Sequence, residues 1–135
     1  MNNLKKIIDK LQRKVLILDG AMGTMIQKEK LKEEDFRGKK FAKIKNNLFG
    51  NNDILNITNQ ELIYKIHKLY LEAGAYIIET NTFNSTKISQ KDYNCEDFSY
   101  DLNFQGAIVA RRAVDDYMKL NSGDLKFVAG VLGPT

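Results

Sequence analysis

Three short apolar runs in the sequence end in polar or glycine-rich segments. They are residues 15–18, which lead into residues 19–24, residues 76–78, which lead into residues 79–84, and residues 127–132, which lead into residues 133–135. Parallel strands that are buried on both faces show this pattern, and they carry functional groups at their carboxyl ends. The pattern therefore predicts three parallel strands. Because the third run reaches the last residue, we expect the chain to be the opening part of a larger domain.

Helices are predicted between these runs. Asn2 or Asn3 caps a first helix that extends to about residue 13 and carries its apolar residues on one face. A short helix is predicted over residues 21–30, and another over residues 84–91. Residues 32–45 are polar, charged and weakly patterned, which indicates a long excursion.

Two longer helices have clearer signals. The capping-box pattern Thr58-x-x-Glu61 predicts the start of a helix that ends at Gly74, and a second helix is predicted over residues 98–119. The residues expected to face inward are Leu62, Ile66, Leu69, Tyr70 and Ala73 in the first helix, and Leu102, Ile108, Val114 and Met118 in the second. Alternating strands and helices predict an α/β fold with a parallel sheet, in one domain over residues 1–135.

Composition narrows the class of protein. Apolar residues make up 43% of the 135 residues, enough for a core. No stretch approaches the roughly 20 apolar residues of a membrane span. The net charge of +4 comes from scattered lysines rather than from a concentrated basic patch, so we expect neither a nucleic-acid nor a membrane partner. The lone cysteine, Cys95, and an N-terminus without a secretory signal predict a cytoplasmic location.

The first strand end carries a candidate ligand site. Asp19 is followed by Gly20, Gly23 and Thr24, and glycines let a ligand approach the backbone. A helix that begins near Ala21 would direct free N–H groups to the same place, where they favour an anion. An anion site beside a carboxylate suits a zwitterion, whose ammonium group Asp19 would hold. An equally good interpretation is an aspartate cap on a helix, with the glycines in a tight turn.

The second strand end is more unusual. Four polar residues, Glu79, Thr80, Asn81 and Thr82, directly follow the apolar run. Since side chains alternate along a strand, about half of these can point into the mouth of a barrel. The alternative is that they form hydrogen bonds that brace neighbouring loops. We favour a functional role, because bracing rarely needs four polar residues in a row.

The sequence does not predict a metal site. Zinc needs three or four cysteine, histidine or carboxylate ligands, whereas this chain has one histidine, His67, and one cysteine, Cys95, 28 positions apart. His67 is expected to pack at the edge of an apolar stripe, and Cys95 to be an ordinary free thiol. We therefore assign no metal ligand and no catalytic residue to this chain.

Six blocks of the sequence, in order, resemble the homocysteine-binding domain of cobalamin-dependent methionine synthase. They are residues 18–27, which read Leu-Asp-Gly-Ala-Met-Gly-Thr-Met-Ile-Gln, and residues 35–38, 50–53, 70–75, 77–86 and 127–135. Six blocks in register over nearly the whole chain are far more specific than any one of them. The betaine- and methylmethionine-dependent homocysteine methyltransferases share the first block only loosely, so the resemblance favours the cobalamin-dependent branch.

The resemblance implies a (β/α)₈ TIM barrel, of which this chain supplies the first three strands of eight. It implies a complete enzyme that binds homocysteine and a catalytic zinc at the C-terminal face of the barrel. There the homocysteine thiolate attacks the methyl group of methylcobalamin and forms methionine. Cobalamin and methyltetrahydrofolate would sit on downstream modules. The substrate-binding residues that the resemblance indicates are Asp19, which would hold the ammonium group, Gly20, Gly23, Thr24, Glu79, Asn81 and Thr82.

One departure from the family pattern limits what the chain alone can do. The zinc-binding cysteines of the family lie on later strands, one isolated and two in a Gly-Gly-Cys-Cys segment, and none of these is present. A barrel needs about 250 residues. We therefore predict that the chain alone neither binds zinc tightly nor transfers methyl groups. With both sheet edges open, we also expect it to be partly ordered and prone to associate unless the remainder of the barrel complements it.

Two other classes of function stay open. A non-catalytic remnant could bind a small amino acid or a partner chain through the loops of Asp19 and Asn81. A nucleotide-binding α/β domain would need a third glycine after Gly20 and Gly23 and an acidic residue about 20 positions further on. The third glycine is missing and the intervening segment is not a βαβ unit, so we expect no nucleotide binding.

Overall fold

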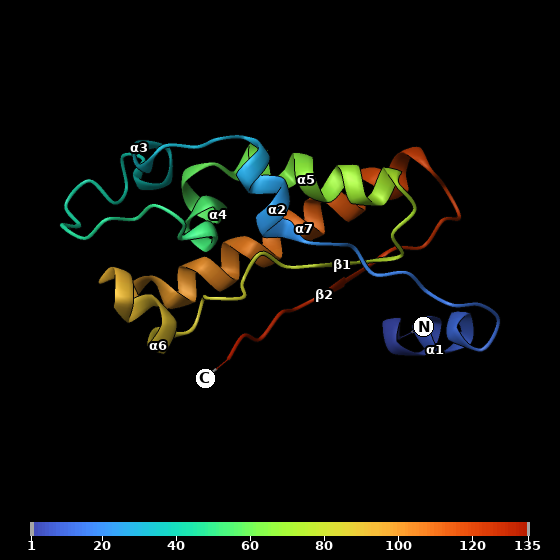
Figure 1. The fold of residues 1–135 in the computed structure, drawn as a ribbon. Helices are drawn as coiled ribbons and strands as arrows, with labels where there is room; N and C mark the ends of the chain where they lie inside the picture. Colours follow the sequence, from blue (N-terminus) through green and yellow to red (C-terminus); the bar gives the residue numbers. More distant parts are fainter. Residues whose placement is uncertain (1, 135) are drawn as a thin grey trace.

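A small parallel sheet organises the fold, and helices cover one side of it (Figure 1). The structure is a computed structural model that describes residues 2–134. Strand β1 (Ile77–Glu79) pairs in parallel with β2 (Phe127–Ala129), with Ile78 opposite Val128. Helix α7 (Ser99–Leu120) connects the two strands. The predicted strand–helix–strand unit and the α/β class are therefore confirmed.

The first predicted strand does not form a regular strand. Leu18 makes a single parallel bridge to Ile77, and the Asp19 N–H donates to the Ile77 carbonyl at 2.9 Å. The segment therefore lies beside β1, but only over about one residue pair. Val15 and Ile17 are exposed, so burial does not stabilise an extended ladder here. The prediction of a regular strand over residues 15–18 is wrong for this reason.

Six further α-helices lie in the described part of the chain. They are α1 (Asn3–Leu11), α2 (Met22–Lys28), α3 (Glu33–Arg37), α4 (Leu55–Thr58), α5 (Gln60–Glu72) and α6 (Lys87–Gln90), with 3₁₀ turns at Asn52–Ile54, Lys91–Tyr93 and Glu96–Phe98. Helix α3 lies inside the stretch that was predicted to be an excursion. No helix in the described part of the chain is both long and apolar enough to cross a membrane.

Helix α5 begins one residue later than its capping box predicts. The Asn59 side chain, rather than that of Thr58, accepts the Leu62 N–H at 3.3 Å. The Thr58 hydroxyl instead donates to the Ile54 carbonyl at 3.2 Å, because Thr58 still belongs to α4. At the other end, Gly74 follows the helix with a positive φ of 107°, as the sequence predicts.

The core lies between α5 and α7 and around the segment before α5. The buried face of α5 contains Ile63, Ile66 and His67, and α7 buries Leu102 and Val114 as predicted. Three residues that were expected to face inward do not, because the helices pack along a rotated face: Leu69 is 42% exposed, Ile108 is 44% exposed, and Ala73 is exposed as well. His67 is buried completely rather than at a boundary, and this burial lowers its pKa to about 4.

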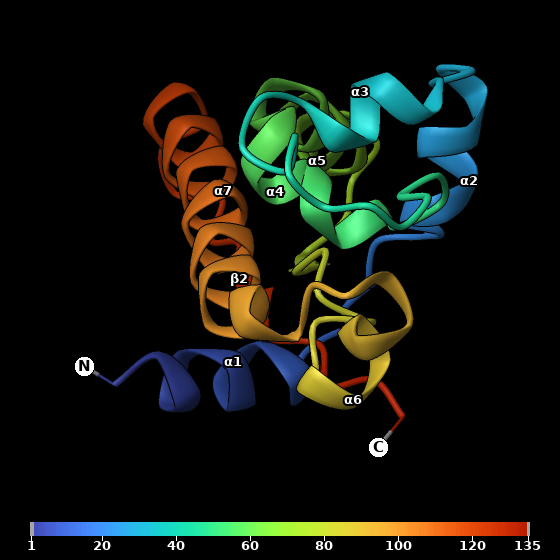
Figure 2. The ribbon, with the colours of Figure 1, turned by 90° about the vertical axis from the view of Figure 1, so that its left-hand side faces the viewer.

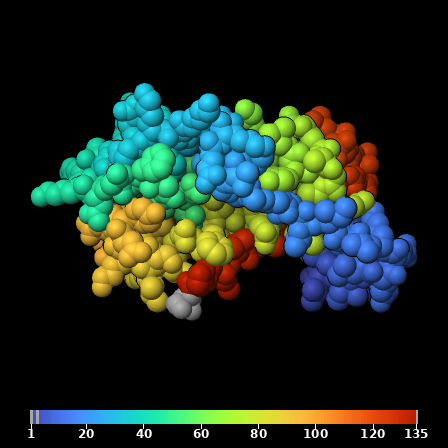
Figure 3. Space-filling model, viewed as in Figure 1, coloured from blue at the N-terminus to red at the C-terminus, as the bar shows by residue number. Residues whose placement is uncertain are grey.

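Helix α1 lies apart from α5 and near the N-terminal ends of the strands (Figures 1 and 2), and it protrudes from the surface (Figure 3). As predicted, Asn2 caps it by accepting the Leu4 N–H. Two lysines attach this region to the strand ends: Lys10 Nζ donates to the Leu125 carbonyl at 3.2 Å, and Lys14 Nζ donates to the Tyr76 hydroxyl. The attachment is therefore polar.

Candidate functional site

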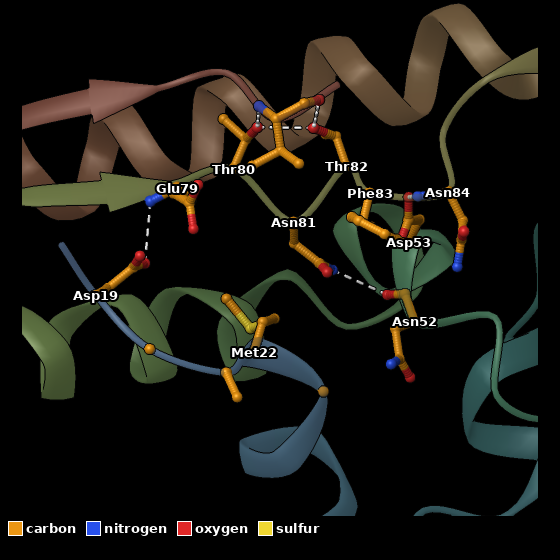
Figure 4. Close-up of a pocket in the computed structure, with 14 residues that line it drawn as sticks. Asp19, Met22, Asn52, Asp53, Glu79, Thr80, Asn81, Thr82, Phe83 and Asn84 are labelled. Atoms are coloured by element: carbon orange, nitrogen blue, oxygen red, sulfur yellow. Dashed lines mark hydrogen bonds between the residues drawn. The ribbon is translucent and has the colours of Figure 1, made fainter. Parts of the chain in front are cut away.

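A cleft of about 420 Å³ opens at the carboxyl ends of the strands (Figure 4). Its walls come from the turn before α2, the 3₁₀ turn at Asn52–Ile54, the segment that follows β1, and Val131 beyond β2. Six of the seven predicted substrate-binding residues line it, namely Asp19, Gly20, Gly23, Glu79, Asn81 and Thr82. Thr24 is exposed on α2 and does not line the cleft. The topology thus brings together two motifs that lie about 60 residues apart.

Asp19 is anchored by one carboxylate oxygen only. The Glu79 N–H donates to its Oδ2 at 2.9 Å, whereas its Oδ1 is buried with no hydrogen-bond partner among the described residues. Burial raises the pKa of Asp19 to about 6, and the negative charge of Glu79 adds to this, although the hydrogen bond from the Glu79 backbone opposes it. Asp19 is therefore mostly ionised at neutral pH but lacks one donor.

The cleft is acidic. Among the described residues, its lining includes three carboxylates, those of Asp19, Asp53 and Glu79, and contains no lysine, arginine or histidine. A concave surface lined by one sign of charge concentrates ligands of the opposite sign. Among zwitterionic ligands, the ammonium end is therefore the one that the side chains of this cleft attract.

The two cleft glycines have different neighbours. A Cβ atom on Gly20 would lie 3.0 Å from the Tyr70 ring, whose hydroxyl donates to the Ala21 carbonyl at 3.2 Å. A side chain at position 20 would therefore crowd the far end of the Tyr70 side chain. At Gly23 a Cβ atom would meet only Asn52 Nδ2, at 3.5 Å, an ordinary contact.

Asp19 does not cap α2. The N-cap of α2 is Ala21, and no side chain caps it. The carboxylate of Asp19 points instead toward the end of β1, where it accepts the Glu79 N–H (Figure 4). The alternative interpretation of Asp19 as a helix cap is therefore wrong, and the carboxylate is a wall of the cleft.

Two residues of the second motif brace the loops that follow β1 and β2. The Val131 N–H donates to Thr80 Oγ1 at 3.0 Å, and Thr82 Oγ1 donates to the Val131 carbonyl at 2.9 Å. The two hydroxyls are 2.7 Å apart (Figure 4). Because the Thr82 hydroxyl donates its only hydrogen to the Val131 carbonyl, the hydrogen bond between the two hydroxyls must be donated by Thr80. The bracing alternative thus describes Thr80 and Thr82, and neither has a hydroxyl hydrogen left for a ligand.

Asn81 and Glu79 differ from these threonines. The Asn81 Nδ2 donates to the Asn52 carbonyl at 2.9 Å and to Asn56 Oδ1 at 3.2 Å, so both of its amide hydrogens are used. Its side chain can offer a ligand only its oxygen. Glu79 is exposed at the cleft and uses its backbone, not its carboxylate, to bind Asp19. Glu79 therefore keeps a free carboxylate.

Sequence reasoning missed Asp53 as a lining residue. Asp53 is only 2% exposed, and it accepts the Asn84 N–H at 2.8 Å and the Ser85 hydroxyl at 2.7 Å. Burial raises its pKa to about 6 despite these two hydrogen bonds. In the sequence, Asp53 is the last residue of a turn cluster, Gly-Asn-Asn-Asp, at residues 50–53. The only signal that could have pointed to the site is that residues 50–53 form one of the six blocks that resemble the family.

The described residues do not supply a zinc site. Within residues 2–134, no three histidine, cysteine, aspartate or glutamate side chains are placed to hold a metal ion. Cys95 is free and fully buried, it does not line the cleft, and burial raises the pKa of its thiol. Its environment is that of a structural thiol rather than of a metal ligand.

Comparison with known proteins identifies the family. Residues 16–135 match the homocysteine S-methyltransferase family. The fold is similar to two crystal structures of the homocysteine methyltransferase MmuM from Escherichia coli, the metallated form with a TM-score of 0.72 and the oxidized form with a TM-score of 0.70, both at 25% identity. The chain belongs to the homocysteine S-methyltransferase family.

The two matches cover nearly all of this chain but less than half of the known structures. The alignments include 98% and 99% of this chain, and 42% and 41% of the respective E. coli chains. The chain thus spans about two fifths of the length of the structures that it matches. Family membership confirms the resemblance found in the sequence at the level of homocysteine methyltransferases.

Proposed function

We propose that this chain forms the part of a homocysteine S-methyltransferase that holds the ammonium group of homocysteine. The observation that carries the proposal is the buried Asp19 Oδ1, which has no hydrogen-bond donor among the described residues. Buried carboxylate oxygens rarely lack a partner, so this atom marks the place of a missing donor. A substrate ammonium group supplies both the donor and a charge opposite to that of the acidic cleft.

The neighbouring residues suit the rest of an amino-acid thiol. Glu79 adds a second negative charge beside Asp19, and the Asn81 side-chain oxygen is free to accept a hydrogen bond. Met22 and Phe83, which is 56% exposed, add apolar surface to the same cleft. We assign the charged end of the substrate to Asp19 and Glu79, and its methylene chain to the apolar surface.

The test compares two ligands on the complete gene product that carries this chain. Homocysteine and 4-mercaptobutyrate differ only by the amino group, and binding is measured by isothermal titration calorimetry. A hydrogen bond to a charged group contributes about 1.5–3 kcal/mol, so we expect Asp19→Asn to weaken homocysteine binding by about 10–100-fold and to leave 4-mercaptobutyrate nearly unchanged. Equal affinity of the unsubstituted protein for both ligands would contradict the proposal.

The pH dependence of binding gives a second readout. The ammonium group needs an ionised Asp19, whose pKa is about 6 in the free protein. We expect the affinity for homocysteine to fall as the pH is lowered through 6, and this dependence to be weaker in the Asp19→Asn variant, in which Asp53 still titrates. Binding of 4-mercaptobutyrate, which lacks the amino group, should change much less over the same range.

We further propose that the complete fold is a (β/α)₈ barrel and that its methyl donor is methylcobalamin, with cobalamin and methyltetrahydrofolate held by other modules. The six sequence blocks support this branch of the family. The test offers the zinc-loaded complete gene product homocysteine together with methylcobalamin, S-methylmethionine or betaine, and measures methionine. Methionine formed only from methylcobalamin supports the branch, and methionine formed from either onium compound overturns it.

Residues 1–135 alone are proposed to be inactive. The side chains described by the structure, those of residues 2–134, do not supply a zinc site, and a homocysteine thiol without zinc stays largely protonated near neutral pH. Zinc stoichiometry by mass spectrometry and a methionine assay on this segment test the proposal. Stoichiometric zinc or methionine formation by residues 1–135 would contradict it.

A further inference from the structure

We infer that a buried amide pair, Asn51 and Gln90, fixes the wall of the cleft and that both are positioning residues for homocysteine binding. The inference rests on the proposed function, because it concerns the same cleft. Neither residue lines the cleft itself, although Asn51 belongs to one of the six sequence blocks, residues 50–53. Their effect on a ligand must therefore pass through the loops that they join.

The two amides pair reciprocally. Asn51 Nδ2 donates to Gln90 Oε1 at 2.8 Å, and Gln90 Nε2 donates to Asn51 Oδ1 at 3.0 Å. Gln90 Nε2 also donates to the Asn84 carbonyl at 2.9 Å. Both side chains are 0% exposed. Three of the four amide N–H groups of this buried pair are thus used, and a displacement of either side chain would leave buried polar groups unsatisfied.

The pair lies behind two loops that form one wall of the cleft. On one side, Asn51 is followed by Asn52 and Asp53, which line the cleft. On the other side, Gln90 holds Asn84, which also lines it. The Asp53 carboxylate joins the same loops by accepting the Asn84 N–H at 2.8 Å. The two loops are therefore tied together at the ligand face by Asp53 and at the rear by the amide pair.

The loop carrying Asn52 also holds Asn81. The Asn52 carbonyl accepts Asn81 Nδ2 at 2.9 Å, which orients the side-chain oxygen that Asn81 can offer a ligand (Figure 4). A displacement of the wall therefore reaches a residue that contacts the proposed substrate. Misplacement of a binding group by about 1 Å can reduce activity by about a hundredfold, so a small shift is enough to be measured.

Stability and binding can be separated by substitution. Removing one amide leaves its partner buried and unsatisfied, which destabilises the fold, whereas replacing both by apolar side chains of similar shape can be nearly neutral. The double substitution still removes the link from Gln90 to the Asn84 carbonyl. A pair that only stabilises the fold would regain binding together with stability, whereas a positioning pair would regain stability alone.

The experiment uses Asn51→Leu, Gln90→Met and the double variant in the complete gene product. The matched control is Gln60→Leu with Gln105→Leu, which removes another amide–amide hydrogen bond, of 2.8 Å, between α5 and α7 and away from the cleft lining. Three quantities are measured: the melting temperature, the dissociation constant for homocysteine, and the hydrogen exchange of residues 81–85.

We expect each single variant to melt at a lower temperature and the double variant to regain part of this loss, since the Asn84 carbonyl still lacks the donor that Gln90 supplied. In the double variant, homocysteine affinity should fall about tenfold and exchange over residues 81–85 should rise, with no such change in the control. If the double variant does not fold, the Gln90→Asn variant replaces it. Asparagine keeps the amide group on a side chain that is one methylene shorter, so this change weakens the pair without removing a polar group. Unchanged affinity and exchange in a folded variant would overturn the inference.

Failure of the proposed function gives a different result. If the unsubstituted protein does not bind homocysteine, the proposed function is overturned and the role of the pair in that binding falls with it. The exchange measurement then decides whether the pair still fixes the wall. Faster exchange over residues 81–85 in the double variant alone supports that, and equal exchange in the double and control variants refutes it.

Discussion

Gly106 of α7 is the position where adding one methyl group should disturb both the fold and the cleft. A Cβ atom there would lie 2.7 Å from Thr82 Cγ2 and 2.8 Å from Asn56 Nδ2, both closer than real side chains approach. Neither neighbour can withdraw freely. Thr82 donates to the Val131 carbonyl, and Asn56 Nδ2 donates to the Asn81 carbonyl at 2.7 Å. The Gly106→Ala substitution therefore forces a buried hydrogen bond to break.

The expected loss follows from three contributions. Alanine in place of glycine stabilises a helix interior by about 1 kcal/mol. Overpacking of a filled site costs about 1–3 kcal/mol, and a buried amide left without its partner costs about 1–3 kcal/mol. The sum is a net destabilisation of about 1–5 kcal/mol for Gly106→Ala. At about 3 °C per kcal/mol for a domain of this size, the melting temperature should fall by about 3–15 °C.

Thermal unfolding followed by circular dichroism measures this shift, with homocysteine titration as a second readout. Ala107→Gly is the matched control, because Ala107 is the exposed neighbour of Gly106 on α7. The control should lose about 1 kcal/mol through helix propensity and keep homocysteine affinity. If Gly106→Ala raises the melting temperature, as the same change does at open helical positions, the steric reasoning is refuted.

Two further predictions concern side chains that support the cleft. The pKa of Asp53 is raised from 3.8 to about 6 by burial, so its contribution to stability is present below pH 4 and is lost as the pH rises to 6. Asp53→Asn keeps an acceptor but does not titrate. Its free energy of unfolding relative to wild type, from urea titrations, should therefore rise by up to about 3 kcal/mol between pH 4 and 6.5, and a constant difference would contradict this. Arg37 pairs with Glu33 and donates to three backbone carbonyls of the following loop, so Arg37→Lys should speed tryptic cleavage of that loop, whereas Arg111→Lys on α7 should not.

The elements whose signals are local could be predicted from the sequence. The long helix α7 and the end of α5 at Gly74 follow from apolar spacing and from a glycine that adopts a positive φ. Helix α3 could not be predicted in this way. It depends on the burial of Phe36 and on Arg37, which donates to the Phe41 and Asn46 carbonyls further along the chain. No periodic pattern in a polar stretch reports such contacts.

The position of the candidate site could be predicted more easily than which of its polar atoms are free to bind a ligand. Parallel strands bring their carboxyl ends together, so Asp19 and Asn81 could be placed in one cleft from the order of elements alone. Which polar atoms remain free depends on partners that the local sequence does not reveal. Gly20 faces Tyr70, and Asp53 becomes part of the wall through its bond to Asn84. The roles of these residues toward a substrate stay predictions.

The hydrogen-bonded ring of Thr80, Thr82 and Val131 has a consequence for evolution. Val131 enters the ring only through its backbone N–H and carbonyl, so its side chain is free to change without breaking it. Positions 80 and 82 must each carry a hydroxyl, because both take part through side-chain oxygens. Among relatives we therefore expect only threonine or serine at these two positions, a restriction that resembles selection for catalysis but arises from selection for the joint between two loops.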